Sequence, residues 1–452
     1  MYGLARRFQT LTNRAGFARG FALFLALLFL AQYAAFERGW FQPATNYRVR
    51  TGSLMRNAVI AAGHWKGLVR DPLVRTPDDL GSAYLLAGLL YVGNSKEEFE
   101  RKEWHVPPES FFFLMSLPYL FTLLLSFFAL DALVSRGFAV VFTLLLAFSR
   151  LGGFLAFSGD VYQFSLLAMF IPLAWAAALR RAPGRWALWA TLAALALFVC
   201  ELFRTTGPTV LAPALAAAVL APRLRLPTAR PSAALLGLLV LALPRALPPS
   251  AKHPFWHALH VGLFEFGGCN SRQTGKAFPY FVRTRRIPPN CFVVSGWSDE
   301  IQDDMLRHLD PTYRGQDDYK ESYESFFRDE VLFLVKYEPV GLASLAGRRA
   351  WNLLVANPWP TMDDDSRIHF REPRDTILRV VLALLVGAAL FFGAWHRAEL
   401  GLFASLLAFA APALLVHSGY LIYNAPATTA LLLLGLWSAR FVLYRSAAGT
   451  SG

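Results

Sequence analysis

Residues 111–130 read FFFLMSLPYLFTLLLSFFAL, a run of twenty residues without a charge. An α-helix rises about 1.5 Å per residue, so a run of this length spans the roughly 30 Å hydrocarbon core of a bilayer. Backbone polar groups in that core must be paired within the protein, and a helix pairs them. The stretch therefore predicts a membrane-spanning helix, which sets the fold class of the chain.

Apolar runs of the same kind recur on both sides of this stretch. Hydrophobic residues make up 55% of the 452 residues and charged residues 17%, which is more apolar surface than a water-soluble domain of this length needs. The sequence predicts an all-α polytopic membrane protein with about ten spans. The predicted spans are residues 20–36, 111–130, 137–157, 161–179, 186–203, 208–222, 233–249, 377–395, 399–417 and 425–443.

Arginine in the short connections sets the predicted orientation. Short cytoplasmic loops of membrane proteins carry an excess of Lys and Arg. With ten spans, the basic termini and connections all fall on one side, and their arginines are Arg6, Arg7, Arg14, Arg19, Arg136, Arg180, Arg181, Arg185, Arg223, Arg225, Arg230, Arg397, Arg440 and Arg445. The termini, 1–19 and 446–452, are therefore predicted to be cytoplasmic. The net charge of +13 is attributed to these loops and not to nucleic-acid binding.

Two long segments, 37–110 and 250–374, lie between the predicted spans. The alternation of sides places both outside the cytoplasm, at the outer face of a bacterial inner membrane. Residues 111–249 between them form a core of six predicted spans, and residues 375–445 supply the last three. No small-residue cleavage site follows the run at 20–36, so it is interpreted as an uncleaved first span.

Both outer segments contain stretches with apolar residues at helical spacing. In the first segment, Leu54 to Val69 and Leu80 to Val92 are interpreted as amphipathic helices. In the second, Tyr319 to Tyr337 has the same pattern, Pro339 is expected to end it, and Val340 to Val355 resembles another surface helix. Such helices lie at the membrane surface and pack against the spans.

Two carboxylates at the outer face are candidates for a general base. Glu37 follows the first span, and Asp160 lies in the tight connection between the third and fourth spans. A partly buried carboxylate accepts a proton more readily than a solvated one, which suits proton removal from a hydroxyl group. Asp160 also precedes a helix whose N-terminal dipole favours a carboxylate. The alternative for each is a solvated charge at a helix end, and Glu37 also has Arg38 as a neighbouring ion-pair partner.

Arginines at a similar depth are candidates for binding a phosphate. Arg204 ends the fifth span, Arg245 lies in the outer part of the seventh, and Arg150 lies inside the third. Arginine inside a membrane is costly unless it faces a partner or a polar cavity, and it binds phosphate with two parallel hydrogen bonds. The alternative for Arg204 is a side chain that extends toward the lipid headgroups.

The second outer segment begins with a histidine cluster. His253, His257 and His260 follow one another at four and three residues, so one helical face can carry them. Phosphate contact or structural hydrogen bonding is favoured over a metal site, because no carboxylate or cysteine lies at a confirming spacing. The acidic run of residues 363–365 is interpreted as a solvated loop, with a divalent-cation site as the alternative.

Two further pairs of residues are predicted to lie at the outer face. Tyr420 and Tyr423 lie in a predicted outer connection and are candidates for lining a headgroup or sugar pocket, with an aromatic belt at the membrane interface as the alternative. Cys269 and Cys291 lie in the second outer segment, where an oxidising compartment permits a disulfide. Two free thiols are the alternative for this pair.

Four stretches carry a resemblance to a known family. Gln42-Pro43-Ala44-Thr45-Asn46-Tyr47, followed by Met55-Arg56 and Gly63-His64-Trp65, looks like a first outer loop of that family. The stretch from Arg328 to Arg349, with Tyr337-Glu338-Pro339, looks like the helical segment before its later spans. With the order of spans and outer segments, these stretches resemble the GT-C superfamily of membrane glycosyltransferases, such as the protein O-mannosyltransferases and the lipid A aminoarabinose transferase.

The resemblance implies a sugar donor linked to polyprenyl phosphate, a base in the first outer loop, and often an Asp in the second. Asp160 matches the second position. At the first position the family usually has an acidic pair after the Pro, whereas this chain has Ala44 and Thr45. The alternatives for the first base are other carboxylates of the outer loop, namely Glu37, Asp71, Asp78 and Asp79.

The leading hypothesis is a membrane enzyme that transfers a sugar from polyprenyl phosphate to a hydroxyl of a glycan, lipid or protein. The departure at Ala44 and Thr45 favours, as the alternative, an inactive scaffold or assembly protein on the same fold. A transporter or flippase is disfavoured, because the sequence shows no internal repeat and no paired charges near the bilayer middle. The sequence leaves the cofactor unknown, with a divalent cation as one possibility and no metal ligand assigned. Nucleic acid is not an expected partner.

Overall fold

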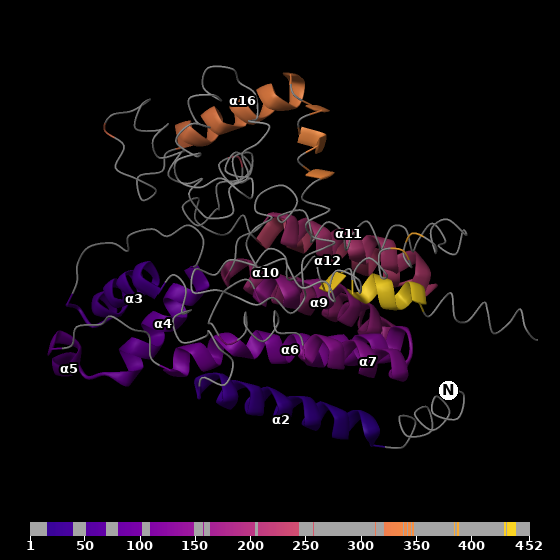
Figure 1. Cartoon of the computed structure of the whole chain (residues 1–452), viewed down its shortest axis with the longest axis horizontal. Helices are drawn as coiled ribbons and strands as arrows, with labels where there is room; N and C mark the ends of the chain where they lie inside the picture. The colour runs from indigo at the N-terminus through magenta and orange to yellow at the C-terminus, as the bar shows by residue number, and fades with distance from the viewer. Residues whose placement is uncertain are drawn as a thin grey trace, which may run out of the picture. The chain divides into compact units, whose positions relative to one another are not determined.

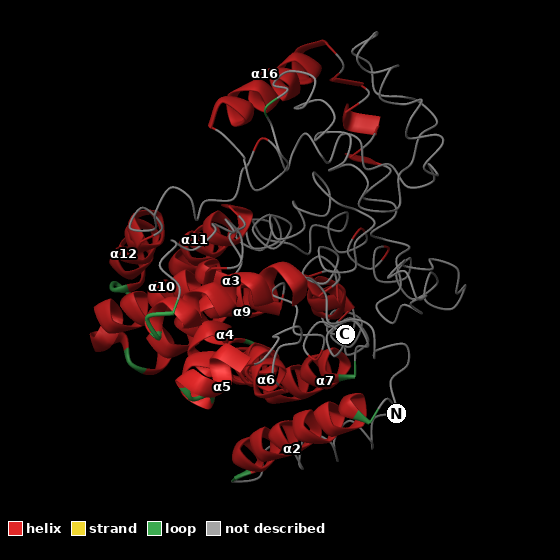
Figure 2. Cartoon of the chain, turned by 90° about the vertical axis from the view of Figure 1, so that its left-hand side faces the viewer, coloured by secondary structure: helices red, strands yellow, loops and turns green. Residues whose placement is uncertain are grey.

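The computed structural model describes part of the chain, and there the regular structure is helical, with no strand (Figure 2). The described residues are 16–38, 51–68, 80–101, 109–148, 157, 163–203, 207–243, 256, 312, 321–337, 339–340, 342–344, 346–347, 384, 387, 429–430 and 432–439. The chain forms two compact units. The first is Met1–Lys252 with Leu384–Phe409 and Thr429–Gly452, and the second is His253–Ala383 with Ala410–Thr428. The all-α class is confirmed for the described residues.

Four helices among the described residues of the first unit are long and apolar enough to cross a membrane. They are α2 (Phe17–Glu37), α6 (Glu109–Leu133), α9 (Gln163–Arg181), and α10 (Trp186–Phe203) together with the short helix η2 (Pro183–Arg185) before it. Each coincides with a predicted span, those at 20–36, 111–130, 161–179 and 186–203. The total of about ten spans stays a prediction.

Three shorter apolar helices occupy further predicted spans. They are α7 (Arg136–Ala147), α11 (Gly207–Leu224) and α12 (Ala229–Ala242), where spans were predicted at 137–157, 208–222 and 233–249. Within the last three predicted spans, the described residues 384, 387, 429–430 and 432–439 are helical. The rest of those spans lies outside the described residues.

Side-chain contacts show how the helices run. Phe21 of α2 contacts Phe127 of α6, and Phe29 contacts Phe113, so α2 and α6 are antiparallel. A short turn at 134–135 joins α6 to α7, which packs against it. α9 packs against α6, α10 and α11, and α12 packs against α10 and α11 (Figures 1 and 2). The described apolar helices from α2 to α12 therefore form one helix bundle.

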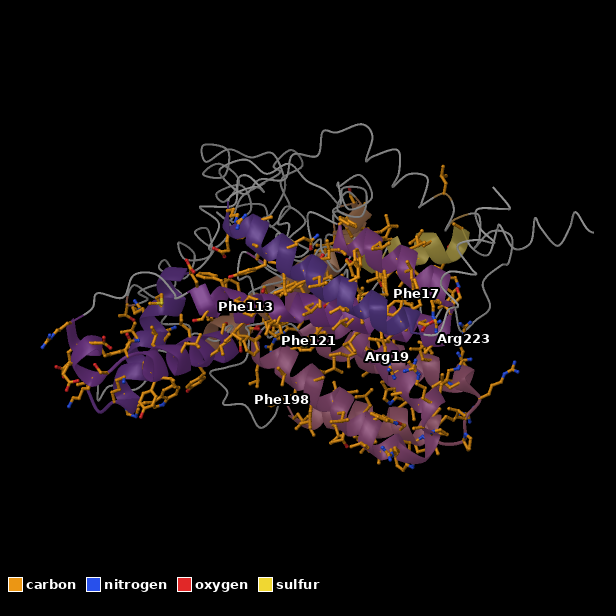
Figure 3. The ribbon with its side chains drawn as sticks, turned by 90° about the horizontal axis from the view of Figure 1, so that it is seen from below. Phe17, Arg19, Phe113, Phe121, Phe198 and Arg223 are labelled. Atoms are coloured by element: carbon orange, nitrogen blue, oxygen red, sulfur yellow. The ribbon has the colours of Figure 1, made fainter. Side chains whose placement is uncertain are left out.

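One end of this bundle, which we call the arginine end, carries the basic connections. There α2, α7, α10 and α12 begin, and α6, α9 and α11 end. Figure 3 shows Arg19 and Arg223 at this end and Phe113 toward the opposite one. The described arginines of these connections are Arg19, Arg136, Arg180, Arg181, Arg185, Arg223, Arg225 and Arg230. We call the opposite end, where α2 and α10 end and α6 and α9 begin, the loop end. Which side of a membrane each end faces stays a prediction.

α7 ends earlier than predicted, and two other helices bind its last carbonyl groups. A span was predicted at 137–157, but the helix ends at Ala147. The Tyr119 hydroxyl donates to the Leu146 carbonyl oxygen at 2.9 Å, and Gln32 Nε2 donates to the Ala147 carbonyl oxygen at 2.8 Å. The last carbonyls of a helix lack partners within it. These donors from α6 and α2 therefore allow α7 to end inside the bundle.

The segment 37–110, which the sequence predicts to lie outside the cytoplasm, contains three described helices at the loop end (Figure 1). They are α3 (Thr51–Trp65), α4 (Leu80–Gly93) and α5 (Lys96–Arg101). The two predicted surface helices coincide with α3 and α4. The amphipathic pattern expected for α4 is wrong, because its sequence is apolar around the whole helix. The reason is packing on more than one side, since α4 contacts α3, α6 and α10.

In the second unit, α16 (Glu321–Tyr337) coincides with the helix predicted over 319–337. Phe327 and Val331, one turn apart, are buried. The Trp256 backbone nitrogen donates to Glu324 Oε1 at 2.5 Å, which joins the start of this unit to the helix. Residues 339–340, 342–344 and 346–347 are helical as well, Pro339 among them.

Candidate functional site

Of the predicted site residues, the structure describes Glu37. It is the last residue of α2, is exposed, and follows the buried Phe36. The others lie outside the described residues, namely Asp160, Arg204, Arg150, Arg245, His253, His257, His260, Tyr420, Tyr423, Cys269 and Cys291. Asp160 and Arg204 have described neighbours close by in the sequence, and the packing of those neighbours is informative.

Phe157 is the centre of an aromatic cluster beside the last turns of α2. Its ring centroid lies 5.8 Å from that of Phe29, 5.7 Å from that of Tyr33 and 5.6 Å from that of Phe36. The side chain is 2% exposed. Tilted and edge-on ring pairs of this kind add about 0.5–1.5 kcal/mol each beyond the burial of area. Phe157 precedes Asp160 by three residues, so this cluster fixes the chain shortly before Asp160 next to the end of α2.

Gln163, the first residue of α9, fixes the chain on the other side of Asp160. Its side chain is fully buried, and its Nε2 donates to the backbone oxygen of Met115 in α6. Only the amide nitrogen can donate to a carbonyl, so this bond sets the orientation of the amide. Its Oε1 is buried and has no hydrogen-bond partner among the residues that the structure describes. Because an unpaired buried acceptor costs about 1–3 kcal/mol, this oxygen is an acceptor available to a hydroxyl group or a water molecule.

Phe203, the last residue of α10, lies directly before Arg204. Its ring stacks on that of Phe164 in α9, with centroids 4.2 Å apart and planes 12° from parallel. Phe203 also packs against Gly81 of α4. A Cβ at Gly81 would lie 2.9 Å from Phe203 Cδ2 and 3.1 Å from the backbone carbon of Leu202. The end of α10 is therefore packed against both α9 and α4.

These contacts form a connected path across the loop end. Phe36, next to Glu37, contacts Phe157, which also contacts Tyr119 of α6. Gln163, the first residue of α9, donates to Met115, which lies one turn from Tyr119 on α6. Phe164, the next residue of α9, stacks on Phe203 of α10. Phe203 completes the path. The described residues that flank Glu37, Asp160 and Arg204 thus share one end of the bundle, although they lie far apart in the sequence.

These packing residues were not among the predicted site residues. A signal for part of the cluster exists, because Phe29, Tyr33 and Phe36 follow one another at four and three residues, the spacing of one helix face. Gln163 and Phe203 carry no such signal, since their partners Met115 and Phe164 belong to other helices. Within the described residues there is no group of three or more His, Cys, Asp or Glu that can hold a metal ion.

The contact at Gly81 allows a test of how α4 packs against the end of α10. Gly81→Ala is expected to destabilise the protein by about 1–3 kcal/mol, the cost of overpacking, because the backbone of Leu202 cannot move as a side chain can. Gly88→Ala is the matched control in the same helix. A Cβ there meets nothing within 4 Å, and alanine favours a helix over glycine by about 0.5–1 kcal/mol. Thermal unfolding in a neutral detergent measures both, and equal effects of the two variants would contradict this packing.

Comparison with known proteins identifies no relative of this chain. No family model, no curated protein and no solved structure matches it. A function is therefore proposed from its own residues and their geometry.

Proposed function

We propose that this protein is a membrane glycosyltransferase-like enzyme that uses a sugar linked to polyprenyl phosphate. It acts at the outer face of the inner membrane and transfers the sugar to a hydroxyl of a glycan, lipid or protein. The supporting observation is the path of contacts at the loop end, from Phe36 to Phe157, from Phe157 across α6 to the start of α9, and from there to Phe203. That path connects residues that flank a carboxylate, a second carboxylate and an arginine, which this chemistry needs.

The proposed reaction assigns one role to each predicted residue. Asp160 or Glu37 removes the proton of the acceptor hydroxyl, whose oxygen attacks the anomeric carbon of the sugar. The bond from that carbon to the phosphate oxygen breaks, and polyprenyl phosphate leaves with the bonding electrons. Arg204, assisted by Arg150 or Arg245, stabilises the charge of the leaving phosphate, which we expect to be the main catalytic contribution. His253, His257, His260, Tyr420 and Tyr423 are proposed to line the substrate.

The test is an assay of the purified protein in phospholipid vesicles. The donors are polyprenyl phosphates that carry a hexose, an N-acetylhexosamine or an aminopentose, and the acceptor is an envelope extract. We expect one donor to release polyprenyl phosphate with sugar bound to an acceptor. Release without protein, or release that heat inactivation of the protein leaves unchanged, would exclude enzymatic transfer.

A second candidate is a scaffold protein on the same fold that has no activity. The observation that favours it is Ala44 and Thr45, where the family usually has an acidic pair. A scaffold would copurify with a partner complex in fixed proportion. It would also release no polyprenyl phosphate from any donor, which separates it from the enzyme.

A further inference from the structure

Arg181, Arg185 and Arg230 are three exposed arginines at the arginine end, and they have no ion-pair partner among the residues that the structure describes. Two neighbouring arginines differ from them. Arg136 pairs with Asp131 at 3.1 Å, and Arg180 donates to the backbone oxygen of Ala132 at 3.2 Å. The three arginines therefore carry charge that the described protein does not neutralise.

Their own helices supply no carboxylate nearby. From residue 180 to residue 243 the sequence has one acidic residue, Glu201, and it is buried near the far end of α10. An uncompensated group of positive charges attracts an anion from outside the protein.

A hydrogen-bond network of buried tryptophan and serine brings the three arginines to one corner of the bundle. Trp175 Nε1 of α9 donates to Ser232 Oγ of α12 at 3.0 Å. Ser232 Oγ donates to the Trp186 carbonyl oxygen of α10 at 3.0 Å. Ser232 follows Arg230 by two residues, and Trp186 follows Arg185 directly. The end of α9 and the starts of α10 and α12 therefore meet there, and we call Arg181, Arg185 and Arg230 the arginine corner.

An exposed apolar stripe runs along α10 away from the arginine corner. Its residues follow one another at four, three and four positions, so they lie on one helix face. They are Leu188, Leu192, Leu195 and Val199, each 45–47% exposed. The stripe is about 17 Å long, close to the roughly 15 Å of one hydrocarbon leaflet.

A second stripe runs along α12, which packs against α10 and starts at the same end. Below Arg230 it consists of Ala234, Leu238 and Leu241, which are exposed and lie four and three residues apart. Each stripe therefore begins beside one of the three arginines. The positively charged arginine corner thus lies next to two exposed apolar helix faces, one on α10 and one on α12.

We propose that the arginine corner binds one anionic phospholipid. The phosphate is held by Arg181, Arg185 and Arg230, and the two acyl chains lie along the stripes of α10 and α12. Basic pockets between membrane helices bind anionic headgroups in this way, and arginine pairs with phosphate through two parallel hydrogen bonds. The site is at the opposite end of the bundle from the proposed transferase site and does not depend on it.

The test is native mass spectrometry and thermal unfolding of the full chain in a neutral detergent with added phosphatidylglycerol, phosphatidylcholine or inorganic phosphate. We expect retention of one phosphatidylglycerol and stabilisation by it, with little effect of the other two. The triple variant Arg181→Gln, Arg185→Gln, Arg230→Gln is expected to bind phosphatidylglycerol roughly 100-fold more weakly, at about a factor of five per arginine.

Three controls make the result decisive. Arg19 lies at the arginine end outside the corner, and Arg101 is the last residue of α5. The variants Arg19→Gln and Arg101→Gln are therefore expected to bind phosphatidylglycerol as the unsubstituted protein does. The triple Lys variant at the three corner positions keeps the charge and is expected to keep the preference for phosphatidylglycerol. Equal stabilisation by phosphatidylcholine, an equal effect of inorganic phosphate, or unchanged binding in the triple Gln variant would each overturn the proposal.

Discussion

Replacing Asp160 by asparagine in the proposed transferase is expected to lower the rate of sugar transfer by about 100- to 10,000-fold, the range over which a general base accelerates a reaction. Asparagine has the shape of aspartate but cannot accept the proton. The loss should appear in kcat more than in KM, because proton removal belongs to the chemical step and not to binding. Release of polyprenyl phosphate by vesicles at saturating donor measures it.

Glu37→Gln separates the two candidates for the base. The variant whose rate of sugar transfer falls by the larger factor identifies the carboxylate that takes the proton. Glu109→Gln is the matched control, because Glu109 is an exposed carboxylate at the first turn of α6, at the same end of the bundle. It is expected to transfer at the rate of the unsubstituted protein. If Asp160→Asn and Glu37→Gln both transfer normally, neither residue is the base.

Phe157→Ala is expected to lower the free energy of unfolding by about 3–5 kcal/mol, the usual cost of removing a buried phenylalanine from a packed core. Phe157 is 2% exposed, and it contacts three rings of α2 and that of Tyr119, whose centroid is 6.4 Å away. Loss of these contacts also releases the chain before Asp160. We therefore expect transfer activity to fall along with stability.

Phe121→Ala is the control for this prediction. Phe121 is on α6, is 52% exposed and is labelled in Figure 3. Its removal leaves no cavity, so a change within about 0.5 kcal/mol is expected. Thermal unfolding in a neutral detergent compares the two variants. Equal shifts of the unfolding temperature would show that Phe157 is not a packing centre.

The sequence predicts much of the described first unit because its signals are local. A run such as 111–130 contains all the information that makes α6 a helix, and the same holds for α2, α9 and α10. The pattern from Leu54 to Val69 likewise predicts α3. The spacing of Phe29, Tyr33 and Phe36 marks the face of α2 that packs inward. These features depend on neighbours within about two helical turns.

Features that depend on distant residues were missed. α7 ends at Ala147 because Gln32 and Tyr119 supply hydrogen-bond donors, and they lie 115 and 28 residues away in the chain. The apolar surface of α4 is understood only with α6 and α10 beside it. The same limit applies to the site: residue type suggests Asp160 and Arg204, whereas their flanking contacts are set by Phe157, Gln163 and Phe203 on other parts of the fold.

The end of α7 also has a mechanical consequence. The Ala147 carbonyl oxygen accepts the Gln32 amide and lies 3.5 Å from the Tyr119 hydroxyl, so one peptide group connects three helices. α2, α6 and α7 are therefore expected to move as a rigid body, because a rotation of α2 would break a bond inside the bundle. The α3–α4 hairpin packs against the bundle through α4. Any hinge motion that admits a bulky substrate at the loop end is accordingly expected in this hairpin, with the bundle as its fixed frame.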